Sequence, residues 1–426
     1  MQFWLLVLLS AVPSAPAAAA DLSTGTLRLA DVLAEVARVN PELAAARKAW
    51  EAAAQVPVQV GAFDDPTATY TGMITDLQTK AGPMKDQWSV SQRVPFWGKR
   101  ALRAEAAQGD AEVARQAWRA KALELAARTT SAFEDLYYLE RTDAILAEQE
   151  SVLRRVARVA DKKYAVGKEP QAAVFRAQVE LAKLETDRVT AQEEAVAARA
   201  RLNALLDRPA RAALASPEEP PVPKADWDDG ALTREALASR PELLAARALE
   251  GSREAQRRLA LRRWFPDFTV GFGYTRIGGG TTNMPYDGQD AQGVTVGLNL
   301  PLWIGKNRAS VREARAREGA ADLSERALAD RTRAQVEDLL VQAQTHARLD
   351  ALYEDEVLPQ ARAALDSTQS AYEADAAGFL DLLDSERALL RFELEQARHR
   401  ADFQIARAEL ERVIGTPLDA AQGAKK

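Results

Sequence analysis

Four short segments of the chain alternate apolar and polar residues with a period of two. In GVTVGLNL, residues 293–300, valine and leucine alternate with glycine, threonine and asparagine. Segments 65–75, 87–94 and 266–278 follow the same pattern. This period predicts β-strands with one apolar face. Each segment is close to the length of about 9–11 residues that a tilted strand needs to cross a membrane.

The apolar faces of these strands have two explanations. They could cover the core of a soluble antiparallel sheet, or they could face lipid. We favour lipid, because the opposite faces carry small polar residues, as around a water-filled lumen, and no apolar layer stands beside them in the sequence. An open sheet would leave backbone groups unpaired in lipid, so we expect an oligomer to close it. Three copies would form a transmembrane β-barrel of twelve strands, with Gly278–Gly280 and residues 76–86 as outer loops.

Long polar stretches with apolar residues at every third or fourth position lie between the strands. They predict helices over 28–56, 99–164, 170–206, 230–263, 306–373 and 379–414. A helix of roughly 66 residues, such as 99–164, would be about 100 Å long. That length suits a tube or stalk rather than a compact enzyme. The expected fold class is therefore α+β, with long antiparallel helical hairpins and four strands per chain.

The order of helix, two strands and helical hairpin occurs twice. Asn40-Pro-Glu-Leu and Arg240-Pro-Glu-Leu open the two halves. The repeat divides the chain into a signal peptide (1–20), a first repeat (21–209), a Pro-rich connector (210–229), a second repeat (230–417) and a loose tail (418–426).

The junction between strand and helix is also repeated. VPFWGKR ends the second strand of the first half, and LPLWIGK ends that of the second half. Pro95 and Pro301 are expected to end the strands, because proline cannot donate to the ladder. Gly98 and Gly305 are expected to let the chain turn into the helix. The adjoining basic residues are expected near lipid headgroups; they are Lys99, Arg100 and Lys306.

Composition narrows the classes of function. The apolar run near the N-terminus, followed by Ala18-Ala19-Ala20, predicts an exported protein. The chain has no cysteine, and its basic residues are spread along a sequence of net charge −6, which argues against nucleic acid. His346 and His399 are expected to be surface residues, not a metal site. We expect no cofactor, no metal and no enzymatic activity.

These paired motifs, together with the turns Tyr164-Ala-Val-Gly and Tyr372-Glu-Ala-Asp, resemble the outer membrane efflux proteins of the TolC type over about residues 27–417. The resemblance implies a homotrimer in the outer membrane of a Gram-negative bacterium, with a helical barrel in the periplasm. It implies an exit duct that works with a periplasmic adaptor and an inner-membrane pump, expected to be of the resistance–nodulation–division type. A non-channel periplasmic adaptor or scaffold of helical hairpins is the alternative.

The resemblance also assigns the turns to periplasmic tips. Asp381 and Asp384 would form a gate of carboxylates, with Tyr372 as part of a latch. The alternative is that the two aspartates stabilise the helix dipole at the start of a helix. The residues expected to dock the adaptor are Tyr164, Gly167, Asp375 and Gly378.

Two departures from the family concern the latch and the cargo. Ala173 and Ala377 stand where relatives carry latch residues, so the closed state is expected to be held in another way. The sequence Pro95-Phe-Trp-Gly-Lys-Arg resembles the junction of the heavy-metal branch, the cobalt–zinc–cadmium and copper–silver type. Heavy-metal cations are therefore one candidate cargo, beside drugs or other molecules, and they would pass without direct coordination by the protein.

Overall fold

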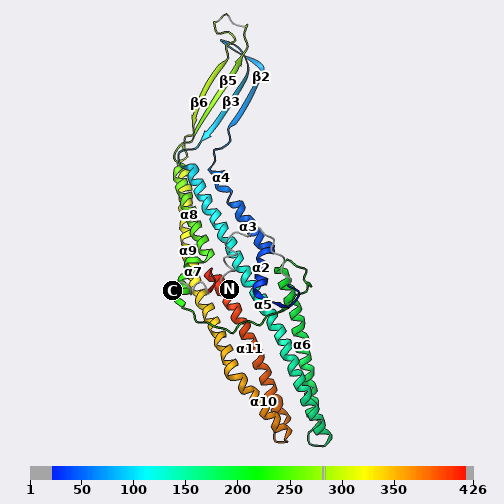
Figure 1. Ribbon diagram of the computed structural model, residues 1–426. Coiled ribbons are helices and arrows are strands. Elements are labelled where there is room, and N and C mark those ends of the chain that lie inside the picture. Colours follow the sequence, from blue (N-terminus) through cyan, green and yellow to red (C-terminus); the bar gives the residue numbers. More distant parts are fainter. Residues whose placement is uncertain (1–21, 281–282, 284, 419–426) are drawn as a thin grey trace. The chain divides into compact units, whose positions relative to one another are not determined.

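The computed structural model in Figure 1 describes residues 22–280, 283 and 285–418. The expected signal peptide, 1–20, lies outside the described residues. In chain order the described elements are β1 (Thr26–Leu27), α2 (Leu29–Val39), α3 (Pro41–Ala53), α4 (Val56–Gly61), β2 (Thr67–Thr79), β3 (Gly82–Val94), α5 (Lys99–Ala165), α6 (Gln171–Leu205), β4 (Ser216–Pro217), α7 (Asp229–Ser239), α8 (Pro241–Arg262), β5 (Phe268–Ile277), β6 (Ala291–Leu298), α9 (Ile304–Leu352), the π-helix η1 (Tyr353–Val357), α10 (Leu358–Glu373) and α11 (Phe379–Ile414).

The chain forms two compact units. The helical unit comprises the described residues up to Ala46, residues Ala117–Leu243, and the described residues from Leu328 onward. The sheet unit comprises Arg47–Gln116 and Leu244–Ala327, apart from the residues that are not described. Helices are the main component of the fold, and the expected α+β class with four longer strands is confirmed.

The sheet unit contains an antiparallel sheet of four strands in the order β2-β3-β5-β6 (Figure 1). Its register places the apolar residues of neighbouring strands opposite one another. Tyr70 pairs with Trp88, and Trp88 pairs with Tyr274. In the next row of the sheet, the small residue Ser89 pairs with Thr69 on one side and with Gly273 on the other. One face therefore carries exposed apolar side chains; they include Tyr70, Trp88, Val90, Val270, Phe272, Val294, Val296 and Leu298.

The first hairpin of the sheet is longer than expected. Residues 76–86 were expected to form a loop, but β2 continues to Thr79 and β3 begins at Gly82. Only two residues connect the strands. The register of β2 against β3 shifts between Gly72 and Leu77. This irregularity breaks the alternation of apolar and polar residues, so the sequence pattern did not indicate that the strand continues.

Proline interrupts the expected helices. The residue before proline is biased towards extended backbone, so Asn40 and Arg240 separate the short helices α2 and α7 from α3 and α8. The Asn40 side chain caps α3 by accepting from the N–H groups of Glu42 (2.9 Å) and Leu43 (3.2 Å). The expected helix 306–373 also contains the π-helix η1, just before Pro359. No helix among the described residues is long and apolar enough to cross a membrane.

The core of the helical unit consists of apolar clusters between helices. One cluster joins α2, α5 and α6; its members include Val32, Val36, Leu125, Phe133, Leu136 and Leu202. Another joins α5, α6, α10 and α11; its members include Leu153, Val156, Ala173, Ala177, Tyr372, Phe379 and Leu382. A third contains Leu418, which is fully buried and does not belong to a loose tail. The remaining tail residues lie outside the described residues.

Candidate functional site

The ends of the two helical hairpins lie side by side in the helical unit (Figure 1). In the first turn, between α5 and α6, Gly167 has φ of +74°. In the second turn, between α10 and α11, Asp375 has φ of +60°. This left-handed conformation favours glycine, and aspartate is one of the few other residues that tolerate it. Asp375 therefore repeats the backbone conformation of Gly167 and adds a carboxylate.

That carboxylate connects the two turns. Asp375 accepts hydrogen bonds from the ammonium groups of Lys163 (2.7 Å), in the last turn of α5, and Lys168 (2.6 Å). Hydrogen bonds from these two lysines lower the pKa of Asp375 to about 2. The carboxylate is therefore ionised at neutral pH. Lys163, Lys168 and Asp375 form what we call the tip clamp.

Tyr372 packs against the Lys163 side of the tip clamp. Its side chain is buried and contacts Phe379 edge to face, with ring centroids 6.1 Å apart. The Lys163 ammonium lies 4.1 Å from the centre of the Tyr372 ring and donates to the Tyr372 carbonyl oxygen. The hydroxyl of Tyr372 has no hydrogen-bond partner in the described part of the chain, and burial raises its pKa to about 12. Ala173, the position at which we expected a departure from the family's latch, is buried in the same cluster.

Asp381 and Asp384 occupy the first turns of α11, on its exposed side. Asp381 accepts from the backbone N–H of Gly378 at 3.0 Å and so helps to cap the start of α11. Asp384 lies 3.6 Å from Arg387, which also binds Glu180 of α6. Both carboxylates remain open to solvent. Tyr164, at the end of α5, is also exposed.

The first strand–helix junction depends on glycine in the way the sequence predicted. Gly98 has φ of +78°, and a Cβ atom there would lie 2.0 Å from Nη1 of Arg262. Arg262 donates to the carbonyl oxygen of Trp97, so its guanidinium occupies the space that a side chain would need. Pro95 follows the last residue of β3.

Asp267 holds this junction together. Its carboxylate accepts from Lys99 (2.7 Å), Arg93 (2.7 Å) and the backbone N–H of Phe96 (3.0 Å). Burial opposes its ionisation, but these hydrogen bonds prevail and lower the pKa of Asp267 to about 2. Lys99 also donates to the Phe265 carbonyl oxygen at 2.8 Å. The expectation that Lys99 lies at lipid headgroups is therefore wrong, since its side chain is buried in an ion pair.

The second junction is built differently. Gly305 lies in the first turn of α9 with no positive φ, and a Cβ atom there would meet nothing within 4 Å. The expectation that Gly305 permits the redirection is therefore wrong. The chain turns earlier, where the N–H groups of Leu302 and Ile304 donate to carbonyl oxygens two residues before them. Pro301 lies at the start of this turn, and Lys306 is exposed.

The two histidines meet across α9 and α11. Nδ1 of His346 lies 3.2 Å from Nδ1 of His399, and both side chains are partly buried. Burial and the neighbouring His346 lower the pKa of His399. The expectation of separate surface histidines is therefore wrong. Within the described residues no group of three or more histidine, cysteine or acidic side chains could hold a metal ion.

Sequence reasoning missed the partners of two aspartates. Lys163 and Lys168 precede Asp375 by 212 and 207 residues, so nothing local in the sequence points to them. Asp267 offered a weak signal, as the acidic residue at the start of an otherwise apolar strand segment, PDFTVGF. A buried acid needs a cation, and Lys99 is one of the cations repeated at the two junctions.

Comparisons with known proteins agree with this fold. A family model described as outer membrane efflux protein matches residues 32–208 and 232–416. The solved structure of the outer membrane protein VceC from Vibrio cholerae has a TM-score of 0.77 at 22% identity, covering 91% of this chain and 96% of that one. The outer-membrane channel OprN has a TM-score of 0.78 at 20% identity, covering 95% and 98%. CusC has a TM-score of 0.75 at 15% identity, covering 91% and 92%. No curated protein sequence is significantly similar to the chain.

Proposed function

Because the chain belongs to the outer membrane efflux protein family, we propose that three copies of it form the exit duct of a tripartite pump. Membership of this TolC-type family makes the chain an outer-membrane efflux channel of a Gram-negative bacterium rather than an enzyme or a scaffold. Our proposals concern the trimer, the gate, the docking surface, the partners and the cargo.

The single observation that supports the trimer is the register of the sheet. β2 and β6 each pair with one neighbour within this chain, and an unpaired strand edge is costly in lipid. The apolar side chains of all four strands share one face, while glycine, serine and threonine share the other. A barrel of twelve strands made by three copies would pair every edge, turn the apolar face to lipid and enclose a polar lumen.

We assign the gate to Asp381 and Asp384. They lie one helical turn apart on the solvent-exposed side of α11. A threefold axis would bring six carboxylates together, which would attract cations at a constriction. In this proposal Asp381 has two roles, since it also caps its helix through Gly378.

The tip clamp replaces the family's latch in this proposal. Asp375 is held by Lys163 and Lys168 across the two hairpins of one chain. Tyr372 packs beneath Lys163 and contributes its ring and carbonyl group instead of its hydroxyl. The exposed surface around this clamp, with Tyr164, Gly167, Asp375 and Gly378, is where we place docking of a periplasmic adaptor.

The pump that supplies the energy would be an inner-membrane transporter of the resistance–nodulation–division type, connected through the adaptor. Heavy-metal cations are the cargo that we propose. The support is the Pro95-Phe-Trp-Gly-Lys-Arg junction and the carboxylates at the gate. A cation would be attracted electrostatically by the carboxylates, and no set of side chains would coordinate it.

Single-channel recording in planar bilayers tests the duct and its gate together. The double variant Asp381→Ala/Asp384→Ala should conduct more than the wild-type channel, because a ring of carboxylates and their bound cations is removed. Half-block by a divalent cation should need about tenfold more of the ion. Gly378→Ser added to the double variant can cap α11 without Asp381, so it is the control for the lost cap.

Each outcome of this recording has a meaning. A channel whose conductance and divalent block are unchanged in the double variant would keep the duct and place the gate elsewhere. A folded protein that forms no channel in the bilayer would contradict the duct itself.

A further inference from the structure

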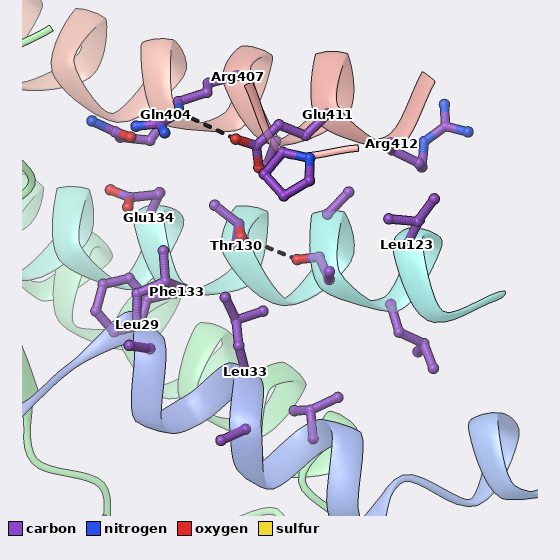
Figure 2. Close-up of a pocket in the computed structure, with 18 of the residues that line it drawn as sticks. Leu29, Leu33, Leu123, Thr130, Phe133, Glu134, Gln404, Arg407, Glu411 and Arg412 are labelled. Atoms are coloured by element: carbon purple, nitrogen blue, oxygen red, sulfur yellow. Dashed lines mark hydrogen bonds and ion pairs between the residues drawn. The ribbon is translucent and has the colours of Figure 1, made fainter. Parts of the chain in front are cut away.

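A cavity of about 620 Å³ opens within the helical unit, away from the tip residues. Its walls come from α2, α5, α11 and residues 218–221 (Figure 2). The volume lies in the range of about 300–1,000 Å³ that is typical of small-molecule sites. Most of the wall is apolar; Leu29, Leu33, Leu123 and Phe133 are examples.

One polar group in this wall lacks a partner. Glu134 of α5 lines the cavity with only 2% of its surface exposed. Its Oε2 atom has no hydrogen-bond partner among the residues that the structure describes. Figure 2 shows the carboxyl group in the space between α5 and α11, near Gln404. A buried polar atom without a partner is costly, and a ligand that satisfies it recovers that cost.

The cations that line the cavity already have acidic partners. Arg407 lies 3.5 Å from Glu411, and Arg412 lies 2.7 Å from Glu409. Arg28, at the start of α2, lies 3.7 Å from Glu218. An anionic ligand would have to compete with these carboxylates. A cationic ligand would instead meet Glu134, whose Oε2 atom has no partner in the described part of the chain.

We propose that this cavity is a binding site for lipophilic amines, with the apolar body between α2 and α5 and the ammonium group on Glu134. The proposal does not depend on the gate or on the trimer, because all the lining residues belong to one helical unit of one chain. It gives the channel a place to hold an amphipathic cation outside its tip.

Proton release should accompany binding. Burial raises the pKa of Glu134 to about 8, helped by the nearby carboxylates of Asp135 and Glu218. The empty site is therefore mostly protonated at pH 7. An ammonium group that binds keeps its own proton, and the proton of Glu134 passes to the buffer. The other charged groups of the wall are Arg28, Glu218, Glu219, Arg407, Glu411 and Arg412.

Calorimetry with two matched probes tests the site. The full chain in lipid nanodiscs is titrated with 2-naphthylmethylamine and with the neutral 2-naphthylmethanol, in two buffers of different ionisation enthalpy at pH 7. We expect saturable binding of the amine with release of a proton, and weaker binding of the alcohol without it. Glu134→Gln should weaken the amine by roughly tenfold to a hundredfold and leave the alcohol within about twofold.

Two further variants keep the test decisive. Glu386→Gln is the matched control: this glutamate is also buried with an unpartnered carboxyl oxygen, but it does not line the cavity. It should change neither affinity. Leu33→Trp fills the apolar end, keeps Glu134 and should weaken both probes. Equal affinities for amine and alcohol, an unaffected Glu134→Gln variant, or no binding at all would overturn the proposal.

Discussion

Replacing Lys99 by methionine should destabilise the protein by about 3–5 kcal/mol, because it leaves the Asp267 carboxylate buried without its main counterion. Both side chains are only 7% exposed, so solvent cannot take the place of the lysine. Thermal unfolding of the detergent-solubilised protein, followed by circular dichroism, would measure the loss. The double variant Lys99→Met/Asp267→Leu should recover part of it, since no charge is then left unpaired.

The chain contains its own control for this experiment. Lys306 occupies the equivalent place in the second junction but is exposed, so Lys306→Met should leave the stability nearly unchanged. Acid provides a further check. The pKa of Asp267 is lowered in the folded state, so its contribution is present above about pH 4 and is lost as the pH falls towards 2. Equal stability of both lysine variants would show that the buried ion pair does not hold the junction.

The sheet could be predicted from the sequence because its register requires only alternation. Val270, Phe272 and Val294 share a face in any antiparallel pairing that keeps the apolar residues together. The loop expected at 76–86 was wrong, since a shift in register between Gly72 and Leu77 hides a strand from a search for a strict period of two. Local periodicity therefore predicted the strands but could not predict where the first hairpin turns.

The pairs that hold the site could not be predicted in this way. His346 and His399 were expected to be separate, yet two neighbouring helices place their rings together. Lys99 was expected at lipid headgroups because the sequence shows a cation beside a strand but does not show that Asp267 is buried next to it. Which acid meets which base depends on how helices far apart in the sequence pack, and a single sequence carries no record of that.

The repeat was informative and also misleading. It correctly indicated two junctions and two tips, but it suggested that equivalent residues have equivalent roles. Gly98 takes a positive φ and Gly305 does not. Conversely, Asp375 adopts the conformation of Gly167 although its side chain is different. Equivalence in the repeat therefore predicts neither the backbone conformation nor the role of a residue by itself, and at the second tip a charged residue stands where the first has glycine.

Removing that charge should open the tip. We expect Asp375→Gly to increase single-channel conductance several-fold, because Lys163 and Lys168 lose the carboxylate that joins the two hairpins. Glycine is the appropriate replacement, since it accepts φ of +60° without strain and thus separates the loss of charge from a change of backbone. Planar-bilayer recording at neutral pH would measure the effect.

The matched control is Asp366→Asn. It removes an exposed carboxylate from α10 outside the clamp and should leave the conductance unchanged. The wild-type channel should also conduct equally between about pH 5 and pH 8. The reason is that the pKa of Asp375 is lowered to about 2, so the clamp stays ionised over that range and fails only as the pH falls below about 4. If Asp375→Gly conducts like the wild type, the two hairpins are held together by the apolar packing of Tyr372 and Phe379, and the clamp has no part in closing the channel.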